Sequence, residues 1–137
     1  MENTLPKLIL AFFLSVSLVG SAIAGNKKVI SFAQLEEMFG HIKSQGKLNL
    51  DEELLWGYFF TDKDPQKLEP VKKALIENGY RFVNLYPTRD KSTFFLHVER
   101  IEQHTSQSLY QRNLLLYKLA DKYNIESYDG MDVGPVK

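Results

Sequence analysis

Residues 54–65, Leu-Leu-Trp-Gly-Tyr-Phe-Phe-Thr-Asp-Lys-Asp-Pro, join an aromatic segment to the start of a helix. The run from Leu54 to Thr61 is rich in aromatic residues and too short for a stable helix, so it predicts a β-strand. Asp64 and Pro65 predict a helix start, because a carboxylate can cap free backbone N–H groups and proline is favoured at the first helical position. This stretch therefore predicts a strand that is followed at once by a helix.

The chain beyond this stretch continues the alternation of strands and helices. The two middle strands are joined by a connection too short for a crossover, so they are expected to be antiparallel. The predicted elements are a helix from Asp64 to Gly79, strands over 80–86 and 93–101, a helix from Thr105 to about Tyr123 and a strand over 126–133. The order β-α-β-β-α-β predicts an α+β fold of the ferredoxin-like type, in which two helices cover one face of a four-stranded antiparallel sheet.

An extra helix is predicted in front of this unit, over 31–44. Ser31 and Gln34 form a capping-box pattern, in which each side chain can satisfy a free backbone N–H group at the helix start. Apolar residues at helical spacing follow, and Gly46 predicts the helix end. Residues 46–53 are interpreted as a linker.

The first 24 residues have the pattern of a cleavable signal peptide. Lys7 gives a positive start, residues 8–19 form an apolar core, and Ala22 and Ala24 fit a cleavage site after Ala24. The apolar core is shorter than the about 20 residues that span a bilayer, and an uncleaved anchor is the alternative. The sequence thus predicts a periplasmic or secreted protein without a stable membrane anchor after cleavage. The predicted organisation is a signal peptide over 1–24, a helix and linker over 25–52 and the ferredoxin-like domain over 53–137.

The composition restricts the possible partners and chemistry. The chain has 17 Lys and Arg against 17 Asp and Glu residues, which gives no electrostatic case for nucleic acid, whose phosphates attract a basic surface. It has no cysteine, which excludes disulfides, thiolate metal sites and a cysteine nucleophile. No cofactor fingerprint or phosphate-binding glycine loop is present. We therefore expect no cofactor and no nucleic acid, and the sequence leaves the oligomeric state open.

Four stretches of the predicted domain are distinctive. They are Trp56-Gly-Tyr-Phe-Phe-Thr61, Phe95-Leu-His-Val-Glu99, His104-Thr-Ser-Gln-Ser-Leu-Tyr-Gln-Arg-Asn113 and, the most specific, Tyr128-Asp-Gly-Met-Asp-Val-Gly-Pro135. Together they resemble the regulator of ribonuclease E activity B (RraB) family, over about Leu54 to Val136. The resemblance implies a ferredoxin-like fold and an activity that works by protein contact without catalysis. The named member of the family binds and restrains the endonuclease RNase E.

Several titratable residues are candidates for chemistry. His97 and Glu99 are two apart on a strand and so point to the same face. With His104, Asp129 and Asp132 they include residue types that bind zinc, but no metal-binding spacing such as H-E-x-x-H is present. A hydrogen-bonded structural pair is the favoured interpretation, and no metal site is predicted. A small hydrolase that uses His97, Glu99 and Asp129 is the enzymatic alternative; no catalytic residue is predicted.

The aromatic residues point to a binding surface. Alternation along the 93–101 strand places Phe95 with His97 and Glu99 on the sheet face that the two domain helices leave uncovered. Trp56 and Tyr58 share one face of the first strand, and if they join Phe95 the patch is typical of a partner-binding surface. The predicted partner-binding residues are Trp56, Tyr58, Phe95, His97, Glu99, Asp129 and Asp132. The alternative is that the N-terminal helix folds over this face and buries its aromatics.

The sequence thus favours a non-enzymatic, exported regulator or inhibitor whose partner is another protein. One rival is a cytoplasmic RNase E regulator whose apparent signal peptide is not cleaved. Another is an envelope immunity protein that neutralises a toxin.

Overall fold

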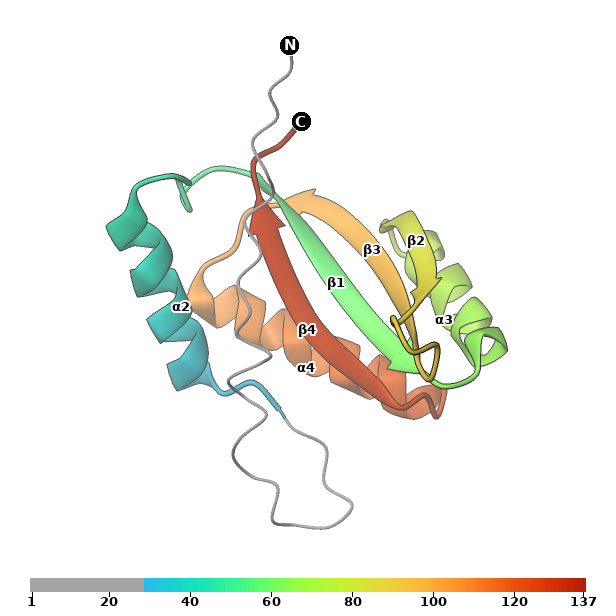
Figure 1. Ribbon diagram of the computed structural model, residues 1–137. Helices are drawn as coiled ribbons and strands as arrows, with labels where there is room; N and C mark the ends of the chain where they lie inside the picture. The colour runs from blue at the N-terminus through green and yellow to red at the C-terminus, as the bar shows by residue number, and fades with distance from the viewer. Residues whose placement is uncertain (1–28) are drawn as a thin grey trace.

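The computed structural model describes residues 29–137, so the predicted signal peptide lies outside the described residues (Figure 1). Every element predicted within residues 29–137 is present, and its ends differ from the prediction by at most two residues. None of the described helices is long and apolar enough to cross a membrane. The elements are α2 (Phe32–Gln45), β1 (Leu54–Asp62), α3 (Pro65–Glu77), β2 (Arg81–Pro87), β3 (Phe94–Glu102), α4 (Ser106–Lys122) and β4 (Ser127–Gly134).

The helix ends follow the local signals in the sequence. The Ser31 hydroxyl accepts a hydrogen bond from the Gln34 backbone N–H, and the Gln34 side chain accepts one from the Ser31 N–H, which confirms the capping box. Gly46 ends α2 in the left-handed conformation, with φ of 68°. Asp64 caps α3 through the Gln66 N–H. Local side-chain chemistry therefore sets these boundaries before any tertiary contact is made.

The four strands form one antiparallel sheet in the order β2-β3-β1-β4. The three described helices lie together on one side of it (Figure 1). Helix α3 packs against β1, β2 and β3, α4 packs against β4, and α2 packs against α4. The prediction of an α+β fold with a four-stranded antiparallel sheet is thus confirmed.

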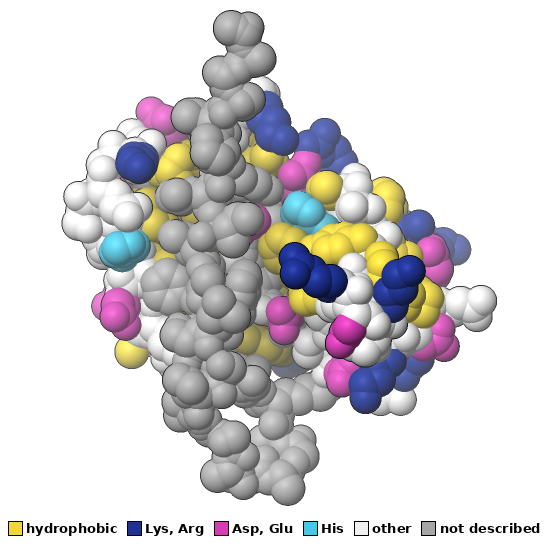
Figure 2. Space-filling view, in the orientation of Figure 1, with side chains coloured by type: hydrophobic (Ala, Val, Ile, Leu, Met, Phe, Trp, Pro, Cys, Tyr) yellow, Lys and Arg dark blue, Asp and Glu magenta, His cyan; other side chains and the backbone are white. Residues whose placement is uncertain are grey.

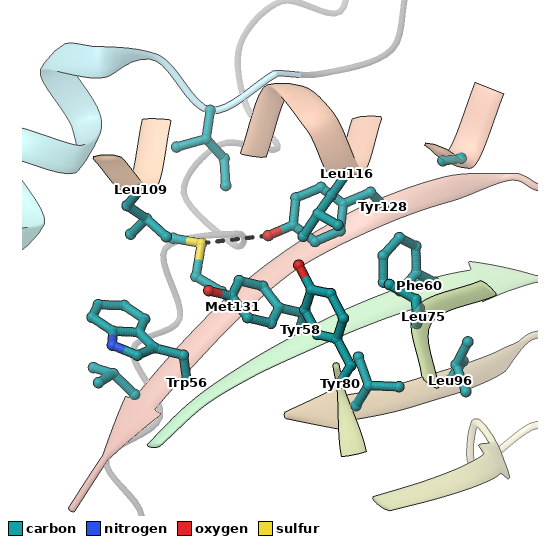
Figure 3. Packing of buried hydrophobic residues seen from close by; sticks show 14 of the residues in the cluster. Trp56, Tyr58, Phe60, Leu75, Tyr80, Leu96, Leu109, Leu116, Tyr128 and Met131 are labelled. Carbon is teal, nitrogen blue, oxygen red and sulfur yellow. Dashed lines mark hydrogen bonds between the residues drawn. The ribbon is translucent and has the colours of Figure 1, made fainter. Parts of the chain in front are cut away.

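The core lies between the sheet and the helices. Because side chains alternate along a strand, Trp56, Tyr58 and Phe60 of β1 all point to the helices, and each is 0% exposed. Figure 3 shows these rings packed with Leu96 of β3 and Met131 of β4. The residues between them on β1 point to the opposite side of the sheet, which no described helix covers. We call this side the helix-free face; the register places on it Leu55, Gly57, Phe59, Arg81, Tyr86, Phe95, His97, Glu99 and Asp132.

The alternative in which the N-terminal helix folds over the uncovered face is wrong. Helix α2 lies beside α4 in the helical layer, where the ring of Phe39 stacks on Trp56 with centroids 6.1 Å apart. The Ile30 backbone N–H donates to the Tyr117 hydroxyl of α4 at 3.0 Å, which holds the start of α2 in place. Leu50, in the predicted linker, is also buried in the same core. The reason is that Trp56 points to the helical side, so the apolar face of α2 packs against it on that side.

Candidate protein-binding site on the helix-free face

A glycine on the central strand brings two polar side chains together. On the helix-free face, Gly57 of β1 pairs with Asp132 of β4 and with Glu99 of β3, and the side chain of His97, two residues before Glu99, also reaches over Gly57. A Cβ atom at Gly57 would lie 2.4 Å from Asp132 Oδ1 and 2.8 Å from His97 Nε2, closer than non-bonded contact allows. The two polar atoms are therefore neighbours above β1, and they occupy the space that any other residue would fill.

Two pairs of stacked rings surround this centre. The imidazole of His97 stacks on Phe59, with centroids 4.3 Å apart and planes 19° apart. Phe95 stacks on Tyr86 of β2, with centroids 5.6 Å apart. All four side chains are half-buried, and such stacking limits their freedom to rotate. In Figure 2 hydrophobic side chains gather around a histidine on this face, with Lys or Arg side chains beside them.

The charges on this face affect one another. Burial raises the pKa of Tyr86, and the negative charges of Asp132 and Asp129 raise it further. Glu99 is buried and forms an ion pair with Arg81, which lies directly opposite on β2 and is exposed. The ion pair with Arg81 therefore holds the Glu99 carboxylate in a defined position. The face thus combines half-buried aromatic rings with carboxylates held in defined positions.

The structure gathers some of the predicted site residues and separates others. Phe95, His97, Glu99 and Asp132 lie together on the helix-free face. Asp129 lies at the β-bulge where the register between β1 and β4 shifts. Trp56 and Tyr58 point to the other side and are 0% exposed. These two residues therefore stabilise the core and cannot touch a partner on the helix-free face.

A polar network on the helical side was not anticipated from the sequence. Glu102 Oε2 accepts hydrogen bonds from the Tyr58 hydroxyl and from Arg112 Nη1, each at 2.7 Å, and lies 3.2 Å from His104 Nε2. The other nitrogen of His104, Nδ1, lies 2.8 Å from Ser108 Oγ. The signal in the sequence was the spacing of Arg112, which lies three residues after Leu109 and four before Leu116, two buried residues of α4. Because its members satisfy one another, the network is structural and separate from the helix-free face.

The pKa of Glu102 reflects this network. Burial alone would raise it, but the hydrogen bonds from His104 and Tyr58 and the charge of Arg112 outweigh burial and lower the pKa to about 2. Glu102 is therefore ionised at neutral pH. Elsewhere, no group of three or more His, Asp or Glu side chains in residues 29–137 is placed to hold a metal ion.

Gly57→Ala is expected to displace the site without unfolding the protein. The new methyl group must push aside Asp132 Oδ1 and His97 Nε2, and both resist displacement because Asp132 is buried and the His97 ring is stacked on Phe59. The free energy of unfolding should fall by about 1–3 kcal/mol, the typical cost of overpacking a buried site. NMR spectra should show shifted ring signals for His97 and unchanged ones for His41, which is exposed on α2. Unfolding of the variant, or unshifted His97 signals, would contradict the described packing.

Comparison with protein families adds an independent finding. The family model described as RraB, regulator of ribonuclease activity B, matches residues 33–133. The match begins within α2, earlier than the resemblance at Leu54, and it includes β1, β3 and β4, which carry the centre of the site. Comparison of the sequence with curated proteins finds no match. Since the matched region spans most of the chain, the protein belongs to the RraB family of ribonuclease activity regulators.

Proposed function

We propose that this protein is a non-catalytic regulator that binds another protein through the helix-free face of its sheet. The observation that carries the proposal is the convergence of three separate sequence stretches on that face. Gly57 and Phe59 come from the first stretch that resembles the family, His97 from the second and Asp132 from the last. Because these residues come from distant parts of the chain and meet at one surface, a shared role in binding is favoured.

The chemistry of the face suits a protein partner. Half-buried aromatic rings can supply contact area with little loss of side-chain freedom, because stacking already orders them. Glu99 is engaged by Arg81, which favours a structural role for this carboxylate over an acid or base in catalysis. The strand order β2-β3-β1-β4 supports a ferredoxin-like arrangement, in which the helices cover one face and leave the other for binding. The balanced charge of the chain argues against nucleic acid as the partner.

We place this activity outside the cytoplasm, on the basis of the signal-peptide pattern in residues 1–24. The test is the intact mass of the protein and the cell fraction that contains it. A species that begins at Gly25 outside the cytoplasm is the expected result. A full-length species in the cytosol would contradict export and favour the second candidate below.

Site-specific cross-linking tests the binding surface. A photoreactive phenylalanine analogue in place of Phe95, on the helix-free face, is expected to form an adduct with one partner protein in cells. The matched control carries the same analogue in place of Leu115, which is 61% exposed on α4 in the opposite layer. Adducts should form from position 95 and not from position 115. Gly57→Ala should reduce the yield of the position-95 adduct several-fold, because the loss of about 1 kcal/mol of binding free energy lowers the affinity by about that factor. Equal adducts from both positions, or adducts from position 115 alone, would rule out the helix-free face.

The family match favours one second candidate, regulation of RNase E in the cytoplasm. Purified RNase E is then expected to form the adduct from position 95, and its cleavage of RNA should slow when the protein is added. Absence of both effects with active RNase E would remove this candidate and leave an extracytoplasmic partner.

A further inference from the structure

The exposed charged side chains along β2, at one border of the helix-free face, are mostly basic. Arg81 begins β2 and its side chain is 69% exposed, while Arg89 and Lys91 are exposed in the turn that joins β2 to β3. This turn directly follows the end of the two strands, next to the stacked rings of Tyr86 and Phe95. We call Arg81, Arg89 and Lys91 the basic rim.

The acidic residues of the helix-free face are already engaged. Glu99 has a side chain that is 5% exposed, and it forms the ion pair with Arg81. Asp132 is 1% exposed, and neither it nor the half-buried Asp129 is without an interaction partner. These carboxylates therefore contribute little to the surface that a partner can touch.

The turn after β2 shows the same difference between acid and base. Asp90 accepts hydrogen bonds from the Ser92 backbone N–H and from the hydroxyl groups of Ser92 and Thr88, and these bonds lower its pKa. Its neighbours Arg89 and Lys91 form no ion pair within residues 29–137. The acid of the turn is thus held by local hydrogen bonds, whereas the two basic side chains are available to a partner.

Arg81 is held in place and still has donors for a partner. Its pairing with the buried Glu99 limits the freedom of the side chain, and the ion pair uses the Nη2 nitrogen. A guanidinium group has five N–H donors, so the exposed part of Arg81 can bind a second carboxylate. Ordered arginines of this kind are typical of the residues that contribute most to protein interfaces.

A partner is not expected to bind here by adding a strand to β2. The Leu85 backbone N–H is bonded to Asn84 Oδ1 at 2.9 Å, and Pro87 has no backbone N–H. The register with β3 also shifts between Phe82 and Asn84. Such features protect an edge strand from pairing with another strand, so contact is made through the side chains of the rim and the rings.

We infer that the basic rim binds an acidic segment of the partner protein, whose carboxylates contact the rim while an apolar side chain packs on the rings of Tyr86 and Phe95. The rim follows the length of β2, roughly 20 Å at about 3.3 Å per residue, so it can contact several acidic side chains of one segment. Complementary charge of this kind orients the partner and speeds association. The inference names the class of partner and rests on the proposed function.

A protein segment fits this surface better than a nucleic acid does. A nucleic acid would bring its phosphates over the whole face, including the carboxylates of Asp129 and Asp132, which repel them. A peptide can place its acidic side chains at the rim alone and an apolar side chain on the rings. Nucleic acid is therefore the competing outcome that the test must separate.

NMR titrations of the full chain with model polymers test the rim without the partner. Poly-glutamate is expected to shift the signals of Tyr86 and Phe95 more than poly-lysine or poly-uridine does at equal monomer concentration. The double variant Arg89→Gln/Lys91→Gln should weaken poly-glutamate binding several-fold. The matched control Lys43→Gln/Lys118→Gln removes the same charge from exposed positions on α2 and α4 and should leave binding unchanged, because salt screens distant charges.

Two results of this titration would overturn the inference. Stronger binding of poly-uridine than of poly-glutamate would show that the face selects nucleic acid. Equal weakening of poly-glutamate binding by the double variant and by its control would show an effect of net charge and not of the basic rim.

The cross-linking assay from position 95 tests the rim with the natural partner. The adduct yield is expected to fall several-fold in Arg89→Gln/Lys91→Gln and to stay unchanged in Lys43→Gln/Lys118→Gln. An adduct that forms equally in the wild type and in both double variants would overturn the inference and leave the proposed function standing. If poly-glutamate binds the rim but no adduct forms in any of these proteins, the rim stands and the proposed function fails, so the two failures are distinguishable.

Discussion

Trp56→Ala is expected to lower the free energy of unfolding by about 4 kcal/mol, the typical cost of truncating a large buried aromatic side chain. Trp56 is 0% exposed, stacks on Phe39 of α2 and meets the His104 ring edge to face at 5.2 Å. Its removal leaves a cavity where β1, α2 and the loop before α4 meet. The attachment of α2 should weaken with it, since Phe39 loses its stacking partner.

Urea unfolding followed by circular dichroism measures this effect, because Trp56 is the only tryptophan in the chain and fluorescence would lose its reporter. Trp56→Phe is the matched control. Trp56 Nε1 has no hydrogen-bond partner among the described residues, so phenylalanine keeps a ring and breaks no hydrogen bond. Trp56→Phe should lower the free energy of unfolding by less than half as much as Trp56→Ala does. A loss below about 1 kcal/mol for Trp56→Ala would place this residue outside the core.

Glu102→Gln is expected to lower the free energy of unfolding by about 3 kcal/mol at neutral pH, because it leaves Arg112 without its counter-charge in a largely buried site. The Glu102 and Arg112 side chains are 14% and 19% exposed, and the hydroxyl of Tyr58 also donates to this carboxylate. The pKa of Glu102 is lowered from 4.5 to about 2. An acid with a lowered pKa in the folded state stabilises the protein above its unfolded pKa and loses that contribution as the pH falls. The difference in free energy of unfolding between wild type and variant should therefore become smaller as the pH falls from 4.5 to about 2.

Urea unfolding of the two proteins at a series of pH values measures this difference. Glu69→Gln is the control, since Glu69 is exposed and forms only a surface ion pair with Lys72 within α3. It should change the free energy of unfolding by less than about 0.5 kcal/mol at any pH. A difference for Glu102→Gln that stays constant from neutral pH to pH 3 would show that the charge of Glu102 does not supply the stabilisation.

The sequence was sufficient for features that depend on neighbours along the chain. The capping box of Ser31 and Gln34, the Asp64-Pro65 helix start and the ends of the strands were all predicted, because side chains and backbone within a few residues decide them. Alternation along β3 likewise placed Phe95, His97 and Glu99 on one face of the sheet. That part of the candidate site follows from the geometry of a single strand.

The tertiary structure decided how the strands and helices combine. Parity along β1 groups Trp56 with Tyr58 but does not tell which side the helices cover, and the structure places both under the helices. Helix α2 lies on the same side because its Phe39 stacks on Trp56, so the position of α2 also had to come from the structure. The role of Gly57 depends on Asp132 and His97, which reach it from two other strands. The network around Glu102 likewise joins residues of β1, β3 and α4. Local chemistry therefore determined the elements and one strand of the candidate site, whereas contacts between distant segments determined which face of the sheet the helices cover.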